Sequence, residues 1–351
     1  MTDLTIYLLE QMKKHPSLQP GDVVKLCYQA AFGAEHLLQD LAGAKAYLEK
    51  EFAEVTAAEG ALYEPISDDI CRVNLAMWKY CGLPVEWLFR MFAASPGLEG
   101  NGEEQFLHYL KQAETVLEST AVGISAAEFQ AFLQEYFKEG IRPVHHSEIY
   151  RQQEQPAYRI INRRFSRLFP ILQKAAEKQR ADRPCIIAID GRAASGKTTL
   201  AKDLQKILEA DTIQMDDFFL PMELRTAERF AQPGGNVHQE RFAAEVLPFL
   251  SNPEPFSYRI FDCGRMDYHG RREIQKKEFR IVEGSYSCHP VFGDYADITV
   301  FSDVEPKEQM ERILKRNGEE MAEMFRTRWI PLEEAYFQAY HIAEKAEIQL
   351  K

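Results

Sequence analysis

The spacing of hydrophobic residues divides the chain into two parts with different periodicities. In the first 180 residues, apolar side chains recur three and four positions apart, the period that places them on one face of an α-helix. Proline and glycine separate many of these runs. This part is therefore predicted to be all-α, with helices at residues 4–14, 21–32, 34–52, 68–80, 85–94, 103–119 and 126–140.

Residues 158–172 are predicted to form one further amphipathic helix. Four apolar residues share one face and four arginines lie largely off it: Ile161, Phe165, Leu168 and Leu172, and Arg159, Arg163, Arg164 and Arg167. We expect the basic face to be solvated, and the alternative is a surface that faces nucleotide or substrate. Pro170 is expected to divide this run, and residues 178–184 to form the hinge into the next domain.

After Pro184 the pattern changes to short apolar runs that alternate with helical segments. The predicted strands are residues 185–190, 211–215, 279–284, 297–304 and, as a last short strand, 347–351. The helical segments include residues 197–209, 306–317 and 332–346. This alternation predicts an α/β domain with a parallel sheet, so the expected division is a helical domain, 1–180, and an α/β domain, 181–351.

The composition is that of an ordinary globular protein, and its charge limits the partners. A length of 351 residues favours two domains. The formal net charge of −12 argues against nucleic acid as the main partner, and no stretch approaches the ~20 apolar residues that span a membrane. The six cysteines form no CxxC pair, and an acid stands where a signal peptide would be basic. We therefore expect reduced thiols and a cytoplasmic protein, and leave homo-oligomerisation open.

The turn after the strand 185–190 contains the pattern GxxxxGK[ST]. Its glycines let backbone N–H groups point at phosphate oxygens, and the following helix N-terminus adds partial positive charge. Lys197 is predicted to reach the terminal phosphates and Thr198 to ligate Mg²⁺. ATP is the expected nucleotide, since no NKxD guanine signature follows, and GTP is left open. The predicted nucleotide-binding residues are Gly191, Ala194, Ser195, Gly196, Lys197, Thr198 and Thr199.

Two adjacent acids, Asp216 and Asp217, follow the strand 211–215. The carboxyl ends of parallel strands share one edge of a sheet, so these acids should lie near the phosphate loop. A carboxylate there can orient a hydroxyl and accept its proton; Asp216 is the predicted base, while Asp217 and Phe218 are predicted to contact the acceptor. Simple turn chemistry is the alternative. Glu283, which ends another strand, is predicted to help hold the metal, unless it is an ordinary strand-end glutamate.

These motifs, GxxxxGKTT, DDFF with a proline soon after, and an apolar strand ending in EG, resemble the uridine kinase group of P-loop kinases. Relatives of that group include nicotinamide riboside kinase, pantothenate kinase and phosphoribulokinase. The resemblance covers about residues 184–351, with the motifs in the family's order. It implies that Asp216 matches the catalytic base and Glu283 the metal-associated carboxylate. Lys197 and Thr198 match the P-loop lysine and the Mg²⁺-binding hydroxyl.

Kinases of this group also carry an arginine-rich lid after the fourth strand, and residues 311–329 occupy that place. Arg312 and Arg316 are the predicted catalytic cations, which would balance charge on the transferring phosphoryl group. Arg326 and Arg328 lie further along. Plain helix-surface charge is the alternative for each arginine.

The acceptor side departs from the family pattern. In uridine kinases an asparagine–aromatic–aspartate segment holds the sugar hydroxyls; here Asn236 is present, but Val237 and His238 replace the aromatic residue and the acid. Histidine lacks the bidentate acceptor that a ribose diol favours. Further candidates for acceptor contact, each of which can instead be a structural loop residue, are Tyr258, Arg259 and Asp262.

The helical domain contains no motif with a known mechanism. Histidines and acids stand near one another at Glu35 and His36, and at His145, His146 and Glu148, but no HExxH or comparable spacing exists. We predict ordinary surface or core residues there, and an accessory domain that regulates the kinase or mediates assembly.

The sequence therefore predicts an ATP- and Mg²⁺-dependent kinase that phosphorylates a hydroxyl of a small molecule, with a nucleoside as the first candidate. One alternative is a non-nucleoside alcohol, either pantothenate-like or a sugar phosphate. The other is a nucleotide-dependent switch with the helical part as effector. The acids Asp216 and Asp217 argue against the switch, because a switch needs no base for a substrate hydroxyl.

Overall fold

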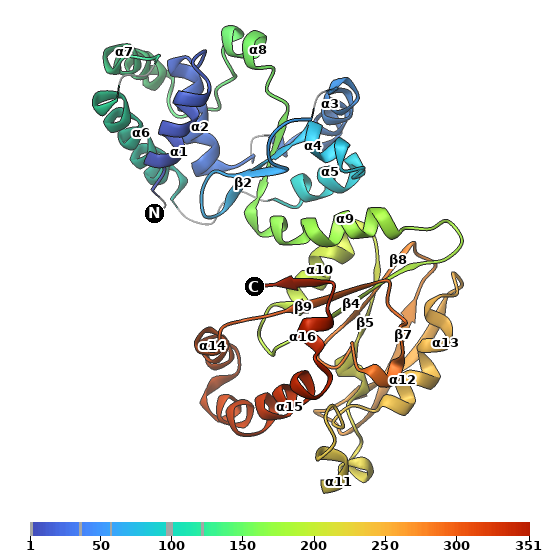
Figure 1. The fold of residues 1–351 in the computed structure, drawn as a ribbon. Helices are drawn as coiled ribbons and strands as arrows, with labels where there is room; N and C mark the ends of the chain where they lie inside the picture. Colours follow the sequence, from blue (N-terminus) through green and yellow to red (C-terminus); the bar gives the residue numbers. More distant parts are fainter. Residues whose placement is uncertain (1–2, 35–36, 57, 96–100, 121–122) are drawn as a thin grey trace. The chain divides into compact units, whose positions relative to one another are not determined.

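The computed structural model describes residues 3–34, 37–56, 58–95, 101–120 and 123–351 (Figure 1). It divides into two compact units, Met1–Arg167 and Leu168–Lys351. The division lies before the boundary predicted at residue 180, because Phe169–Lys178 forms helix α9, which packs against strand β9 of the second unit. Pro170 stands in the first turn of α9, where its missing N–H costs no helical hydrogen bond.

The first unit is mainly helical, but it is not all-α as predicted. Its described helices are α1 Thr5–Lys14, α2 Pro20–Phe32, α3 Leu41–Glu54, α4 Leu75–Tyr80, α5 Val85–Ala93, α6 Gly102–Ser119, α7 Ala126–Tyr136 and α8 Glu148–Glu154. An antiparallel sheet accompanies them, with strand order β1 Tyr63–Pro65, β2 Ile70–Asn74, β3 Tyr158–Asn162.

Two of the predicted helices are wrong in their first parts, because this sheet takes residues from both, whereas α4 and the start of α9 lie in their later parts. Strand β2 lies within the predicted helix 68–80, and β3 opens the predicted helix 158–172. The two strands pair along their whole length, from Ile70 with Asn162 to Asn74 with Tyr158. Apolar positions in a short run fit either period, and here tertiary pairing decides in favour of strands.

The second unit contains a five-stranded parallel sheet, in agreement with the predicted α/β class (Figure 1). The strand order is β10–β9–β4–β8–β5, and every predicted strand is present: β4 Cys185–Gly191, β5 Asp211–Gln214, β8 Phe279–Glu283, β9 Ile298–Ser302 and β10 Ile348–Leu350. Every residue of β4 is buried, as expected for a central strand. Helix α10, Lys197–Leu208, packs against β4, β5 and β8.

The second unit has six further helices and a hairpin outside the parallel sheet, within the described residues. The helices are α11 Ala227–Phe230, α12 Gln239–Glu245, α13 Leu247–Leu250, α14 Pro306–Met324, α15 Ile330–Tyr340 and α16 Ile342–Lys345. Strands β6 Phe256–Asp262 and β7 Asp267–Ile274 form a separate antiparallel hairpin. Helix α14 is kinked at Gly318, whose φ of 79° is not helical, so its regular first part ends where the sequence predicted.

Among the described residues, no helix has the length and apolar character that crossing a membrane requires. One core cluster of the second unit joins the sheet, the turn Met215–Phe218, α12 and the β6–β7 hairpin, and includes Phe218, Phe242 and Tyr258. These contacts fix the turn that carries Asp216 and Asp217 relative to the sheet.

Candidate active site

The loop between β4 and α10 has the backbone of a phosphate-binding turn. Gly191 has a φ of 138°, and a Cβ there would lie 2.0 Å from the carbonyl oxygen of Ser302, so only glycine fits. Ala194 and Gly196 also have positive φ, at 58° and 95°. The first N–H groups of α10 have no helical acceptor, and they lie at the positive end of the helix dipole. The loop is therefore suited to an anion.

Three side chains from the C-terminal helices hold this loop in place. Glu333 of α15 accepts a hydrogen bond from the N–H of Ala193 at 2.9 Å. On the carbonyl side, Gln309 donates to Ala193 O at 3.0 Å, and Arg312 donates to Ala194 O at 3.0 Å. The loop conformation therefore depends on α14 and α15 as well as on its own glycines.

Lys197 is buried against the loop that it follows. Its Nζ donates to the carbonyl oxygens of Gly191 and Arg192 at 2.7 and 2.8 Å. Ser195 is also buried, and its N–H closes the turn by donating to Arg192 O at 3.2 Å. Thr199, one position into α10 from Thr198, is exposed.

Thr198 and Glu283 lie side by side at the end of the loop. The Thr198 hydroxyl donates to Glu283 Oε1 at 2.9 Å. Burial raises the pKa of Glu283, and the negative charge of Asp216 raises it further, whereas Thr198 and Lys197 lower it. A hydroxyl and a carboxylate are hard oxygen donors of the kind that Mg²⁺ prefers.

Asp216 follows β5 in a short 3-10 turn, Met215–Phe218. Its side chain is exposed to solvent, although the protein around it is dense enough that desolvation raises its pKa. The positive charges of Lys197 and Arg316 act in the opposite direction, and the charge of Asp217 adds to the increase. Asp216 therefore shares one electrostatic environment with the phosphate-loop lysine.

Asp217 points away from that environment and into the core. It is 6% exposed and accepts hydrogen bonds from the Tyr258 hydroxyl and from Arg272 Nε, both at 2.8 Å. Its backbone carbonyl also accepts a hydrogen bond from Arg241. The adjacent acids thus have different environments: one is open to solvent, and the other ties the turn to the β6–β7 hairpin.

Several residues predicted to contact the acceptor have structural contacts instead. Phe218 and Tyr258 are fully buried and pack against each other, so both belong to the core. Asp262 accepts backbone hydrogen bonds from Gly264 and Arg265 in the hairpin turn. A side chain without exposed surface cannot contact a substrate in this arrangement.

The other predicted acceptor contacts lie on or near α12. Arg259 forms an ion pair with Glu245. His238 is the N-cap of α12, where its ring accepts from the N–H of Arg241 at 3.3 Å. Asn236 is 6% exposed. Its Oδ1 is buried and, within the described chain, has no hydrogen-bond partner.

The arginines of the predicted lid have separate environments. Arg312 contacts the loop at Ala194 and pairs with Glu308, and Arg316 is exposed, with its charge acting on Asp216. Arg326 pairs with Glu323. Arg328 lies over the rings of Phe230 and Trp329, at 5.0 and 4.9 Å.

Sequence reasoning missed the buried acids that connect the loop to its surroundings. Asp190, the residue before Gly191, is fully buried and accepts from the Tyr336 hydroxyl at 2.8 Å and from the N–H groups of Tyr286 and Cys288. Burial raises its pKa. The position of Asp190 at the end of an otherwise apolar strand could have identified it from the sequence, whereas no local pattern distinguishes Glu333 from other helical glutamates.

The histidines and acids of the first unit were predicted to be ordinary surface or core residues, and the described ones form no metal site. The described residues contain no group of three or more His, Cys, Asp or Glu that could hold a metal ion. His146 contacts Asp22 and Tyr158, and Glu148 begins α8. Glu35 and His36 lie outside the described residues.

No protein-family model matches the chain, and no curated protein matches it either. Among solved structures, it is similar to a protein named as a possible uridine kinase from Bacillus stearothermophilus, with 18% identity, a TM-score of 0.42, and coverage of 53% of this chain and 98% of the other. A protein from Silicibacter sp. TM1040, named for a fructose transport system kinase, has 21% identity and a TM-score of 0.45, with coverage of 52% and 98%.

A third similar structure is the D-glycerate 3-kinase of Cryptococcus neoformans, with 15% identity, a TM-score of 0.34, and coverage of 48% and 86%. All three bear the names of small-molecule kinases and cover about half of this chain. At these identities and TM-scores, they establish no activity for it.

Proposed function

We propose that the second unit is an ATP- and Mg²⁺-dependent phosphotransferase that acts on a hydroxyl of a small molecule. The observation that carries the proposal is the placement of an open carboxylate, Asp216, directly after β5, at the same edge of the parallel sheet as the phosphate loop that follows β4. Nucleotide binding alone requires no such base, whereas transfer to a hydroxyl does.

The residues present fit both the nucleotide and the metal. The loop from Gly191 to Thr198 offers N–H groups and a helix N-terminus to phosphates, and Lys197 can exchange its two carbonyl contacts for phosphate oxygens. Thr198 and Glu283 would hold Mg²⁺, which in such sites is shared with the phosphates of the substrate. When bound, Mg²⁺ supplies charge neutralisation to the phosphoryl group.

In this mechanism each side chain has one role. Asp216 orients the acceptor hydroxyl and takes its proton as the bond to phosphorus forms. Lys197 holds the terminal phosphates, and Arg316 adds positive charge on the open side of the site. Asp217 positions the turn through Tyr258 and Arg272, and Arg312 positions the loop through Ala194.

The acceptor class is the finer part of the proposal. A nucleoside is the first candidate, because the order of motifs resembles that of uridine kinases. A non-nucleoside alcohol is favoured by one observation: His238, at the position of the sugar-binding acid, caps α12 with its ring. Its imidazole therefore already serves a backbone N–H.

The direct test is ADP release with Mg·ATP against a panel of nucleosides, vitamins, sugars and hydroxy acids. Stimulation by one class, and only with Mg²⁺ present, supports the proposal and names the acceptor. Release that is indifferent to every acceptor contradicts it and favours a nucleotide-dependent switch. GTP in place of ATP, at the same Mg²⁺ concentration, decides the nucleotide preference.

A further inference from the structure

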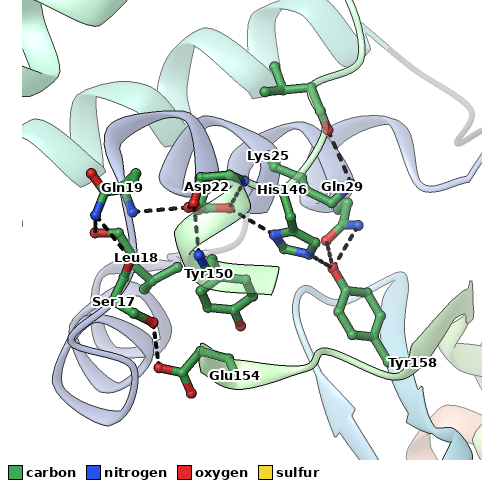
Figure 2. A network of polar contacts seen from close by, with 12 residues as sticks. Ser17, Leu18, Gln19, Asp22, Lys25, Gln29, His146, Tyr150, Glu154 and Tyr158 are labelled. Carbon is green, nitrogen blue, oxygen red and sulfur yellow. Dashed lines mark hydrogen bonds and ion pairs between the residues drawn. The ribbon is translucent and has the colours of Figure 1, made fainter. Parts of the chain in front are cut away.

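The first unit contains a buried line of hydrogen bonds that the kinase site does not use (Figure 2). His146 lies between an acid and a phenol: its Nδ1 is 2.9 Å from Asp22 Oδ1, and its Nε2 is 2.7 Å from the Tyr158 hydroxyl. Asp22 is fully buried, whereas Tyr158 is partly exposed. The line therefore runs from a fully buried acid to a residue that is partly exposed.

The hydrogen bonds in this line have one consistent direction. Asp22 also accepts from the N–H and hydroxyl of Ser147, at 2.9 and 2.6 Å. Burial alone would raise the pKa of Asp22, but the hydrogen bonds from His146 and Ser147 lower it below its ordinary value. Burial lowers the pKa of His146. The Asp22 carboxylate can only accept, so His146 donates to it from Nδ1, and the neutral ring with that tautomer accepts at Nε2. Tyr158 is thus the donor to His146.

The other side of the Tyr158 hydroxyl is occupied by the Gln29 amide, whose oxygen accepts at 3.4 Å and whose nitrogen is a donor. Gln29 Nε2 donates to its oxygen at 3.2 Å, and Gln29 Oε1 accepts from Arg72 at 2.8 Å. The Arg72 guanidinium lies 4.4 Å from the centre of the Tyr158 ring. A donor to its oxygen and a cation at its ring therefore accompany the base on this phenol.

Two cations belong to this part of the first unit, and one of them has an unused donor. Arg72 is 6% exposed, and its buried Nε has no hydrogen-bond partner in the described part of the chain. Lys25 lies one turn of α2 from Asp22 and donates to Val144 O at 3.1 Å. Burial and the charges of Arg72 and Arg151 lower its pKa to about 8. Such cations suit an anionic ligand.

The acids near this cluster are already engaged. Glu64 bonds Gln11, and Glu154 bonds His15 and Ser17. The phenol, the imidazole and the cations come from α2, β2, the segment before α8, and β3, so the fold itself brings them together. A nucleophile within hydrogen-bond reach of a base, which a third group orients, is the arrangement of an activated nucleophile.

We propose that the first unit carries a second active site, in which Tyr158, with His146 as base and Asp22 as positioning residue, attacks the phosphorus of a small phosphate monoester. Lys25 and Arg72 bind the phosphate oxygens. The Tyr158 oxygen forms a bond to phosphorus as the bond to the leaving alcohol breaks, and its proton passes through His146 Nε2 to that alcohol. Water then cleaves the tyrosyl–phosphorus bond and releases inorganic phosphate.

The test uses the full chain without nucleotide and p-nitrophenyl phosphate as the probe. Wild type is expected to release p-nitrophenol, and Tyr158→Phe and His146→Gln to lose about 100-fold or more of that rate. Tyr80→Phe removes a phenol that is 77% exposed and should change nothing. Lys197→Ala should also retain the rate, which separates this reaction from the phosphate loop.

A measurement on the unaltered protein avoids dependence on variants that fold poorly. Acid quenching during turnover should trap phosphate on Tyr158, located by mass spectrometry, and thermal unfolding checks each variant. Absence of p-nitrophenyl phosphate turnover, or turnover that Tyr158→Phe leaves unchanged, overturns the proposal. If the protein hydrolyses p-nitrophenyl acetate in a Tyr158-dependent way but does not hydrolyse p-nitrophenyl phosphate, the proposed substrate class of phosphate monoesters is wrong. Because the kinase assay uses a different site, its failure and this failure are distinguishable.

Discussion

The hydroxyl of Thr198 donates to Glu283 Oε1 at 2.9 Å, which joins the first turn of α10 to the end of β8. The two residues are 85 positions apart in the chain. Their contact brings a hydroxyl and a carboxylate together beside the phosphate loop, and neither residue alone has the donor set for a magnesium site.

We predict that Thr198→Val abolishes Mg²⁺-dependent turnover, because it removes one oxygen donor and also the hydroxyl that donates a hydrogen bond to Glu283. Thr198→Ser keeps the oxygen and should retain most activity. Magnesium titrations of acceptor-dependent ADP release compare the variants. Equal magnesium dependence in the valine variant and wild type would remove both residues from the metal site.

Gly191→Ala should destabilise the second unit. The new Cβ would meet the Ser302 carbonyl at 2.0 Å, and φ is 138°, so strain of at least ~1–3 kcal/mol is expected. Gly293→Ala is the matched control: its φ is also positive, at 66°, but nothing lies within 4 Å of the added Cβ. The difference between the melting temperatures of the two variants measures the effect of the steric clash apart from that of the positive φ. Equal decreases in melting temperature would contradict this account.

Asp217→Asn should lower stability rather than catalysis. Asp217 pairs with Arg272, whose side chain is 32% exposed. Because this exposure weakens the pair relative to a fully buried one, we expect a loss of about 2 kcal/mol in the free energy of unfolding. Tyr258→Phe removes one of the same hydrogen bonds and should cost about 1 kcal/mol. Urea unfolding measures both, and kcat per folded molecule should stay near wild type. A loss of turnover as large as that of Asp216→Asn would give Asp217 a direct role.

Activity should have an acid limb set by Asp216. Desolvation by the surrounding protein raises the pKa of Asp216, and only the deprotonated form of Asp216 accepts a proton. The pH at which kcat/KM rises should therefore lie above the pKa of an ordinary aspartate. Its ionisation is easier in the unfolded chain, so its contribution to stability is full at low pH and is lost as pH rises through the folded pKa.

Arg316→Gln tests that assignment, because the charge of Arg316 lowers the pKa of Asp216. The acid limb should move to higher pH in this variant. Arg326→Gln, which removes an arginine paired with Glu323, is the control and should leave the limb in place. If the acid limb of the pH profile stays at the same pH in the Arg316 variant, a group other than Asp216 sets it.

The sequence was most informative where function and burial act locally. The all-apolar strand β4 and its glycine-rich turn were recognisable because every β4 side chain is buried and because Gly191 has no room for a Cβ. The chain gave no comparable sign of β2 and β3, whose identity depends on pairing between segments far apart. Glu333 was unpredictable for the same reason, since it reaches Ala193 across 140 positions.

The acceptor side was the least predictable part of the site. Asp217 and Phe218 stand beside Asp216 in the sequence, and adjacency suggested a shared role. A 3-10 turn directs successive side chains to different sides, so Asp216 remains open while its neighbours enter the core. Side-chain direction in an irregular turn cannot be obtained from periodicity.

The most direct test of the central claim is acceptor-dependent ADP release by Asp216→Asn, measured beside nucleotide binding with the acceptor found in the panel. We predict that turnover falls by at least ~100-fold while Mg·ATP affinity stays within a few-fold of wild type, because the base is lost and the phosphate loop is not. Turnover close to wild type in that variant would contradict the assignment of Asp216, and with it the mechanism.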